Sequence, residues 1–325
     1  MVARQQRIDP RKVNRATRPQ AKGGRKSGPP PVRKATAADW IAGARIRTLP
    51  LAIAPVALGS ACAYLLSMPG VHWVRALLCL AVALLLQIAV NYANDYSDGV
   101  RGTDNHRVGP SRLTGSGAAK PRTVLTVALV FFGLAALAGL AVVVLGQQWW
   151  LVAVGAACLV AGWFYTGGKR PYGYYGLGEV FVFIFFGLVA TLGTMYVQVG
   201  EVSLEAWLCA AAIGSISCAV LVVNNIRDRE QDALAGKRTL TVLIGDRASR
   251  ILFTVLLVLV PFGILVFFAI FYVNAYLVYF VLLAAIPAAV ITLFAKTPPE
   301  LIVALRLATV TALTFGLGLA AAIAF

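Results

Sequence analysis

The chain has 325 residues, of which 59% are hydrophobic and only 13% are charged, yet its formal net charge is +16. Soluble domains usually carry about 45–50% apolar and about 25% charged residues. These values exclude an ordinary soluble enzyme, a disordered chain and a disulfide-rich secreted domain. They leave a polytopic membrane protein whose bases are concentrated in a few segments.

Residues 1–38 are the most basic part of the chain. They hold eleven Lys and Arg, a single acid and the run Gly28-Pro29-Pro30-Pro31, with almost nothing apolar to bury. This composition is typical of disorder, and no apolar stretch follows where a secretory signal needs one. We expect a disordered basic cytoplasmic tail next to an anionic lipid leaflet, and nucleic acid is not an expected partner.

Nine apolar segments follow the tail, each about long enough to cross a bilayer as a helix. They lie near residues 49–67, 74–93, 123–145, 149–166, 178–199, 206–225, 250–273, 276–295 and 301–324. We therefore expect an all-α integral membrane domain with nine transmembrane helices over residues 39–325.

The connections between these segments alternate in charge. Those after the second, fourth, sixth and eighth spans hold Lys or Arg, whereas the others are short and contain, of Asp, Glu, Lys and Arg, only Glu201 and Glu205. Positive loops stay on the cytoplasmic side. The N-terminus and the basic loops are therefore predicted to face the cytoplasm, and the C-terminus the outside.

Two acid clusters stand at the predicted cytoplasmic ends of the second and sixth spans. Helical residues four and seven or eight apart share one face. Each cluster has an Asn and two Asp at this spacing: Asn91, Asp95 and Asp98 in the first, and Asn224, Asp228 and Asp232 in the second. Such close carboxylates repel each other unless a cation lies between them, and hard oxygen ligands suit Mg²⁺ held together with substrate phosphates. Two facing stripes predict a magnesium–diphosphate clamp; solvated helix ends and a transporter's ion site are the alternatives.

Bases on the same side of the membrane suit an anionic substrate. Arg and Lys bind a diphosphate and stabilise it as it leaves, although topology alone accounts for any one of these bases. The candidates for this role are Arg101, Lys169, Arg170 and Arg227. The connection at residues 165–179 is rich in Gly and Tyr, which allow close backbone approach and can face a developing cation. An interfacial aromatic belt explains the same tyrosines.

At these residues the sequence resembles the UbiA superfamily of membrane prenyltransferases, from about Ala38 to the C-terminus. The likeness is carried by N-Y-A-N-D-Y-S-D at 91–98, R-G-T-D at 101–104, R-P-Y-G-Y-Y-G-L-G-E at 170–179, N-N-I-R-D at 224–228 and G-K-R-T-L at 236–240. The runs at 170–179 and 224–228 are most similar to the branch that prenylates 1,4-dihydroxy-2-naphthoate. Ile46 and Arg47 stand where the family usually has Pro and often Lys.

The resemblance implies nine helices around a central cavity with cytoplasmic cap loops, in the cell membrane. It implies Mg²⁺-dependent transfer of a polyprenyl chain from polyprenyl diphosphate to 1,4-dihydroxy-2-naphthoate, with decarboxylation, in menaquinone biosynthesis. Asp95, Asp98, Asp228 and Asp232 would be catalytic, and the candidates for holding the acceptor are Arg45, Asp104, Tyr165, Lys237 and Arg238. Another aromatic acceptor and transport of an anionic solute are the alternative functions.

Overall fold

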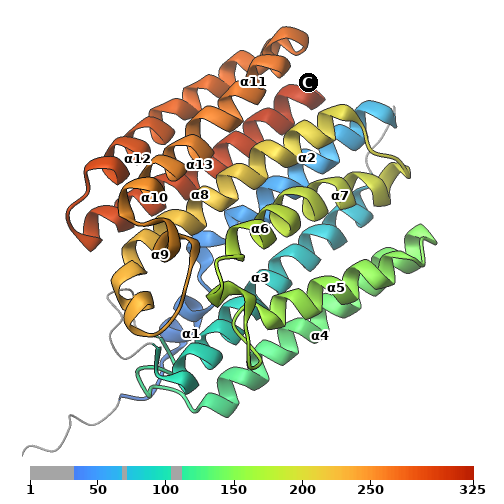
Figure 1. Cartoon of the computed structure of the whole chain (residues 1–325). Coiled ribbons are helices and arrows are strands. Elements are labelled where there is room, and N and C mark those ends of the chain that lie inside the picture. The colour runs from blue at the N-terminus through green and yellow to red at the C-terminus, as the bar shows by residue number, and fades with distance from the viewer. Residues whose placement is uncertain (1–32, 68–71, 104–111) are drawn as a thin grey trace, which may run out of the picture. The chain divides into compact units, whose positions relative to one another are not determined.

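The structure is a computed structural model in which residues 33–67, 72–103 and 112–325 are described. These ranges contain helices, turns and short connections but no strand (Figure 1). The predicted all-α fold is therefore confirmed. The predicted tail lies outside the described residues up to position 32, and the first helix begins two residues before the predicted start of the domain.

Each of the nine predicted spans corresponds to a helix or to a continuous helical segment. In chain order these are α2 (Pro50–Leu66), α3 (Trp73–Arg101), α4 (Pro121–Gly146), α5 (Leu151–Phe164), α6–η5–α7 (Gly178–Val182, Phe183–Val189 and Ala190–Val199), α8 (Leu204–Leu234), α10–η6–α11 (Asp246–Thr254, Val255–Leu259 and Val260–Phe271), η7–α12 (Val273–Val281 and Leu282–Phe294) and α13 (Pro298–Ala324). Four short helices accompany them: α1 (Ala37–Gly43), η2 (Ile46–Thr48), η4 (Tyr172–Tyr174) and α9 (Leu240–Ile244).

Seven of these segments are long and apolar enough to cross a membrane by themselves, within the described part of the chain. Helix α2 joins α1 and η2 in a broken span bent by 44°. Helix α5 has only 14 residues, fewer than the roughly 20 that a full crossing needs. The chain is thus a multi-pass membrane protein, and the seven or eight candidate spans among its described residues are roughly consistent with the nine predicted segments.

Helices α3 and α8 continue about two turns beyond the apolar stretches that predicted them. The sequence placed their ends near residues 93 and 225, where apolarity stops, but they end at Arg101 and Leu234. Gly102 terminates α3 in the left-handed conformation (φ 73°), and its N–H bonds back to the Asp98 and Gly99 carbonyls. Both acid clusters therefore lie on regular helix.

Helix α8 is the central helix of the bundle. Of its 18-residue apolar window, 78% is buried, more than for any other candidate span. It packs against α2, α13, α10, α11 and η5. Small residues allow this packing: a Cβ on Gly187 of η5 would lie 2.8 Å from the Gly214 Cα of α8, so the two backbones touch.

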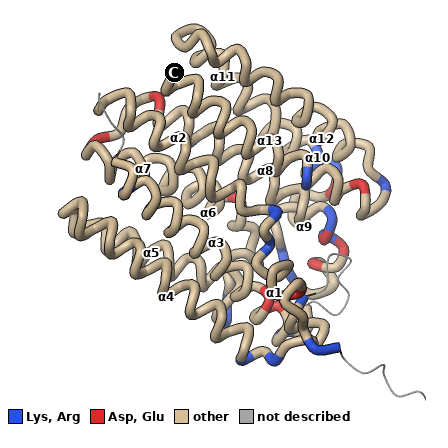
Figure 2. The backbone as a smooth tube through the Cα atoms, turned by 180° about the vertical axis from the view of Figure 1, so that it is seen from behind, with Lys and Arg blue, Asp and Glu red and all other residues tan. Residues whose placement is uncertain are grey.

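Ionisable residues gather at one end of the bundle, around α1, α9 and the last turns of α3 (Figure 2). The opposite end carries exposed tryptophans, namely Trp73, Trp149, Trp150 and Trp207, as is typical of a membrane interface. Arg75 ties this end together by donating to the Leu145 carbonyl of α4 (2.9 Å) and the Val197 carbonyl of α7 (3.0 Å).

Candidate active site

A cavity of about 1360 Å³ runs through the bundle and reaches its charged end. One face each of α3 and α8 lines it, with spacings of three and four residues. The lining residues are Cys79, Val82, Ala83, Leu86, Gln87, Val90, Asn91, Asn94 and Asp95 from α3, and Ser217, Val220, Leu221, Asn224 and Arg227 from α8. The first residues of both acid clusters therefore face one cavity, which no sequence pattern could establish.

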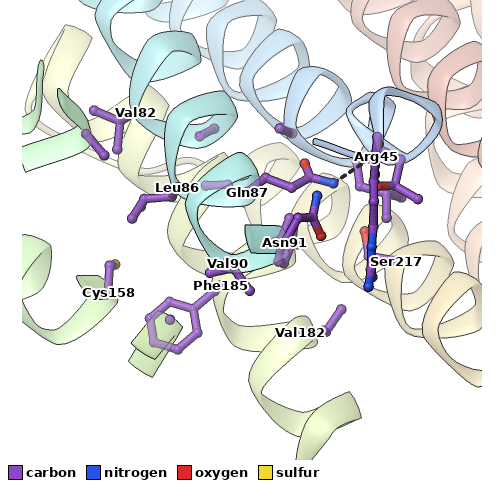
Figure 3. A pocket seen from close by; sticks show the side chains of 18 of the residues that line it. Arg45, Val82, Leu86, Gln87, Val90, Asn91, Cys158, Val182, Phe185 and Ser217 are labelled. Atoms are coloured by element: carbon purple, nitrogen blue, oxygen red, sulfur yellow. Dashed lines mark hydrogen bonds between the residues drawn. The ribbon is translucent and has the colours of Figure 1, made fainter. Parts of the chain in front are cut away.

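The cavity has a polar side and an apolar side (Figure 3). Gln87, Asn91 and Arg45 lie together on the polar side, whereas Val82, Leu86 and Cys158 lie on the other. Gln87 Nε2 donates to the Thr48 carbonyl (2.6 Å), and Asn91 Nδ2 donates to the Ala44 carbonyl (2.9 Å). These two amides hold the bend between α1 and α2 against α3.

Arg45 occupies the sharpest part of that bend. Its backbone is left-handed (φ 54°, ψ 52°), a conformation that costs a non-glycine residue of order 1 kcal/mol or more. Its side chain lines the cavity, where Figure 3 shows it projecting toward Asn91 and Ser217. The strained backbone thus places a guanidinium on the polar wall.

Asp95 is buried, with an exposed fraction of 3%. Its two carboxylate oxygens accept the backbone N–H groups of Leu113 (2.9 Å) and Thr114 (2.8 Å). The carboxylate therefore anchors the chain where it returns toward α4, while it also lines the cavity.

Asp98 is the meeting point of four segments and is only 2% exposed. Its Oδ1 accepts the Tyr174 hydroxyl (2.6 Å) and the Lys237 ammonium (3.1 Å), and its Oδ2 lies 3.3 Å from the Arg112 guanidinium. Lys237 Nζ also lies 3.9 Å from Asp232 Oδ1. Lys237 is thus a cation that lies between the two acid clusters and offsets the repulsion between their carboxylates.

Tyr174 lies between two cations. Lys237 Nζ is 4.7 Å and the Arg101 guanidinium 5.3 Å from its ring centre, within cation–π range. Burial, together with the nearby Asp98 carboxylate, raises the pKa of the phenol. The phenol therefore stays protonated and remains a hydrogen-bond donor. Arg101 also donates to the Thr166 and Gly168 carbonyls and so fixes the glycine-rich connection.

On α8 the acid cluster is organised locally. Arg227 holds its neighbour Asp228 with two bonds, Nε to Oδ1 (2.7 Å) and Nη2 to Oδ2 (2.6 Å), and also donates to Asn224 Oδ1 (2.9 Å). On another face of the helix, Asn225 Nδ2 donates to Glu179 Oε1 of α6 (3.0 Å). That buried bond joins α8 to α6, while Asn224 and Arg227 face the cavity.

The remaining candidates fall in different places. Tyr165 lines the cavity and packs edge-on against Tyr172, with ring centres 5.5 Å apart. Lys169, Arg170 and Arg238 are exposed and are not on the cavity wall. The structure thus does not bring Lys169 and Arg170 to the acid clusters. Asp104 lies outside the described residues.

Besides Tyr174, the candidates from sequence missed at least four other polar residues of the site. Three of them are Gln87, Arg112 and Asn94, whose Oδ1 accepts the Thr166 hydroxyl (2.6 Å). The fourth, Arg306 of α13, lines the cavity. A signal for it existed, because Arg306 is the one charged residue within the apolar segment 301–324.

Two acid clusters on helices that line one large, mostly apolar cavity agree with a family comparison. The model of the UbiA prenyltransferase family matches residues 52–306. The chain belongs to the UbiA prenyltransferase family. Among curated UbiA relatives, a Mycobacterium tuberculosis protein named 1,4-dihydroxy-2-naphthoate octaprenyltransferase is 53% identical over 233 residues, covering 72% of this chain and 78% of its own. The Escherichia coli protein of the same name is 37% identical, over 65% of this chain and 70% of its own.

Solved UbiA structures share the fold. A UbiA homologue from Aeropyrum pernix superposes with a TM-score of 0.66 at 15% identity, over 85% of this chain and 98% of its own. A homologue from Archaeoglobus fulgidus, bound to DMAPP and Mg²⁺, gives a TM-score of 0.59 at 13% identity, over 88% of this chain and 99% of its own.

The donor set at the helix ends fits Mg²⁺ by its chemistry. It consists of carboxylate and amide oxygens alone, the ligands that Mg²⁺ prefers. Within the described ranges no three His, Cys, Asp or Glu side chains form a ready-made metal cluster. Mg²⁺ sites of this type take one or two carboxylates and complete their shell with substrate phosphates and water, so one carboxylate from each cluster is enough for such a site.

Proposed function

We propose that this protein transfers a polyprenyl chain from polyprenyl diphosphate to 1,4-dihydroxy-2-naphthoate. The C1–O bond of the donor breaks, and diphosphate leaves with the electron pair. The ring carbon bearing the carboxylate bonds to C1, and carbon dioxide is lost as its bonding electrons restore the aromatic ring. The product of this step is demethylmenaquinol, the two-electron-reduced form of demethylmenaquinone; an external oxidant such as dioxygen converts it to the quinone.

One observation carries this proposal: Lys237 bridges Asp98 and Asp232, while Arg112 and Arg227, which pair with Asp98 and Asp228, line a cavity of about 1360 Å³ whose walls are otherwise mostly apolar. Such a cavity suits a long isoprenoid tail, and the charged mouth suits its diphosphate. A tail of this kind stays in the bilayer, which explains why the site lies within a helix bundle.

The bases would act on the departing diphosphate. Arg227 lines the cavity, and its guanidinium is held in place by Asn224 and Asp228. Lys237 is held over the Tyr174 ring. Cations fixed before the reaction stabilise developing negative charge without reorganising. The Tyr174 ring lies against Lys237 and Arg101 and so helps to hold Lys237 in place.

Mg²⁺ is part of the proposal. Asp98 and Asp228 would hold it, with Asn91, Asp95, Asn224 and Asp232 around them. When bound, the ion would neutralise charge on the diphosphate oxygens. The Archaeoglobus fulgidus homologue was solved with Mg²⁺ and DMAPP, which supports this assignment by family.

The acceptor is proposed from the relatives' names. Proteins from Mycobacterium tuberculosis, Haemophilus influenzae and Bacillus subtilis, 53%, 39% and 33% identical, are all named 1,4-dihydroxy-2-naphthoate octaprenyltransferase. The charged end of the bundle is proposed to face the cytoplasm and the C-terminus the outside of the cell membrane, in line with the positive-inside rule.

The test is product formation by membranes containing the protein. They are incubated with labelled polyprenyl diphosphate and a panel of aromatic acids, with and without a chelator, and the products are identified by mass. We expect a demethylmenaquinone mass with 1,4-dihydroxy-2-naphthoate alone, lost on chelation and restored by Mg²⁺. A product with a different acid would reassign the acceptor, and uptake of an anion into proteoliposomes without any product would replace the enzyme by a transporter.

A further inference from the structure

The charged residues on the cavity wall are strongly unbalanced. Among the described residues that line it there is one acid, Asp95, whose oxygens already accept two backbone N–H groups. Against it stand five arginines: Arg45, Arg47, Arg112, Arg227 and Arg306. The wall therefore carries more positive charge than its own acids offset, and it suits an anionic ligand.

These arginines are not equivalent. Arg112 and Arg227 pair with the carboxylates of the two acid clusters, Asp98 and Asp228. Arg47 of η2 and Arg306 of α13, in contrast, make no ion pair or hydrogen bond with any residue in the described ranges, and both are exposed and line the cavity. Of these two, only Arg306 lies within an unbroken membrane-spanning helix. The Arg306 guanidinium is therefore available to bind an anionic ligand in the cavity.

Arg306 also lies where a charge is costly. It stands eight residues after Pro298, the first residue of α13, so it lies about 12 Å along the helix. A charged side chain inside an apolar span is expensive and marks a functional site by default. Asn91 and Asn224 lie about 15 Å from the charged ends of α3 and α8, which is a comparable depth.

The surroundings of Arg306 select the kind of anion. Its neighbours on the cavity wall of α13 are Ile302, Leu305, Thr309 and Val310, and η2 and α2 pack against this helix. Arg306 is the one guanidinium that α13 contributes to the cavity wall, and it is flanked there by mostly apolar residues. Such a guanidinium matches one carboxylate in a bidentate pair, with a flat apolar ring beside it. A diphosphate carries several charges and instead matches the clustered bases around Asp98.

We propose that Arg306 binds the carboxylate of the aromatic acceptor and seats its ring against the α13 wall, facing the donor site at the ends of α3 and α8. This inference rests on the proposed function and adds to it a residue that determines acceptor specificity. It assigns the carboxylate to α13, in place of the three basic candidates from sequence. Lys237 is bound to Asp98, Arg238 lies outside the cavity wall, and Arg45 lies on the polar side of the cavity with Asn91.

The test measures equilibrium binding to the full chain in lipid nanodiscs without donor, so it does not depend on turnover. The probes are 1-hydroxy-2-naphthoate and 1-naphthol, which differ only in the carboxylate. Arg306→Leu should weaken binding of the acid about 10- to 100-fold, as expected for loss of a charged hydrogen-bonded pair, and should leave binding of 1-naphthol within about twofold. Arg306→Lys should retain part of the affinity.

A matched control is Lys296→Gln, which removes an exposed base just before the same helix and should change neither affinity. Thermal unfolding of each variant verifies that it is folded. Equal weakening of both probes, no weakening, or weaker binding of polyprenyl diphosphate instead would overturn the proposal. So would an effect that disappears in nanodiscs without anionic lipid, because Arg306 would then bind a lipid headgroup.

Steady-state kinetics separate this inference from the proposed function. Arg306→Leu should raise KM for 1,4-dihydroxy-2-naphthoate about 10- to 100-fold with a much smaller change in kcat and in donor KM. If the wild-type protein does not prenylate this acid but still distinguishes the two probes through Arg306, the proposed function fails and the carboxylate site stands.

Discussion

The charged ends of α3 and α8 carry nearly the same pattern of one Asn and two Asp, but their carboxylates are held in different ways. On α3, Asp98 binds side chains from three other segments, namely Arg112, Tyr174 and Lys237. On α8, Asp228 is held by the adjacent Arg227. Similar spacing in sequence therefore leads to a hub between segments on α3, whereas on α8 Asp228 forms a bidentate pair with a neighbour on its own helix, called here the local pair.

This difference predicts that the two clusters contribute differently to the stability of the fold and to catalysis. Breaking a buried charge pair costs about 3–5 kcal/mol when the remaining charge stays uncompensated. The α3 cluster should therefore contribute to both folding and catalysis, whereas the α8 cluster should contribute mainly to catalysis. The predictions below test that division.

The largest effect is expected for Asp98→Asn. It leaves Arg112 and Lys237 without their shared carboxylate, so we expect prenyl transfer to fall about 1000-fold, the upper range for losing one charged group at a catalytic centre, and thermal stability to fall clearly. Product formation and thermal unfolding in detergent measure the two effects. Asp246→Asn is the control, because that carboxylate is 41% exposed and pairs with Arg250 at the surface, where such pairs contribute at most about 1 kcal/mol.

Asp228→Asn should reduce transfer about 100-fold with a smaller loss of stability, about 1–2 kcal/mol, because Arg227 keeps its bond to Asn224 Oδ1. The comparison of melting temperatures with Asp98→Asn is decisive. If the two variants lose the same stability, the distinction between hub and local pair is wrong.

Lys237→Met removes the cation between the two clusters but keeps most of the aliphatic stem. Asp98 and Asp232 would then lose their common partner, so we expect donor KM to rise about 10-fold or more and added Mg²⁺ to compensate in part. An unchanged donor KM would separate Lys237 from the diphosphate site.

Tyr174→Phe should have a modest effect, about 1 kcal/mol in stability and a few-fold in rate. It removes the hydroxyl that donates to Asp98 but keeps the ring under Lys237 and Arg101. Tyr174→Leu removes both and should be worse. Tyr175→Phe is the neighbouring control, since Tyr175 is 55% exposed, and it should match the wild type.

The smallest effect is expected for Lys169→Gln and Arg170→Gln. Both side chains are exposed and lie off the cavity wall, so we expect less than about a threefold change in rate. A larger rise in donor KM would show that these bases reach the diphosphate, as the sequence predicted.

Sequence patterns predicted the parts of the site that depend on local spacing. Apolar runs predicted the nine segments, and the intervals within 91–98 and 224–232 placed each Asn and its acids on one helix face. The boundaries of α3 and α8 were less accurate, because hydropathy stops at the membrane surface while the helical hydrogen bonds continue to Gly102 and Leu234.

By itself, the sequence determined that this chain is an all-helical membrane protein with oxygen-rich clusters at two helix ends, because hydrophobic length and helical periodicity are local properties. Only the tertiary structure decided which cations those acids meet, that α8 is the central helix and that Arg306 faces the same cavity. Lys237 reaches Asp98 across 139 positions, and Arg306 reaches the cavity from the last helix. Such contacts follow from how the helices pack, which no local pattern encodes.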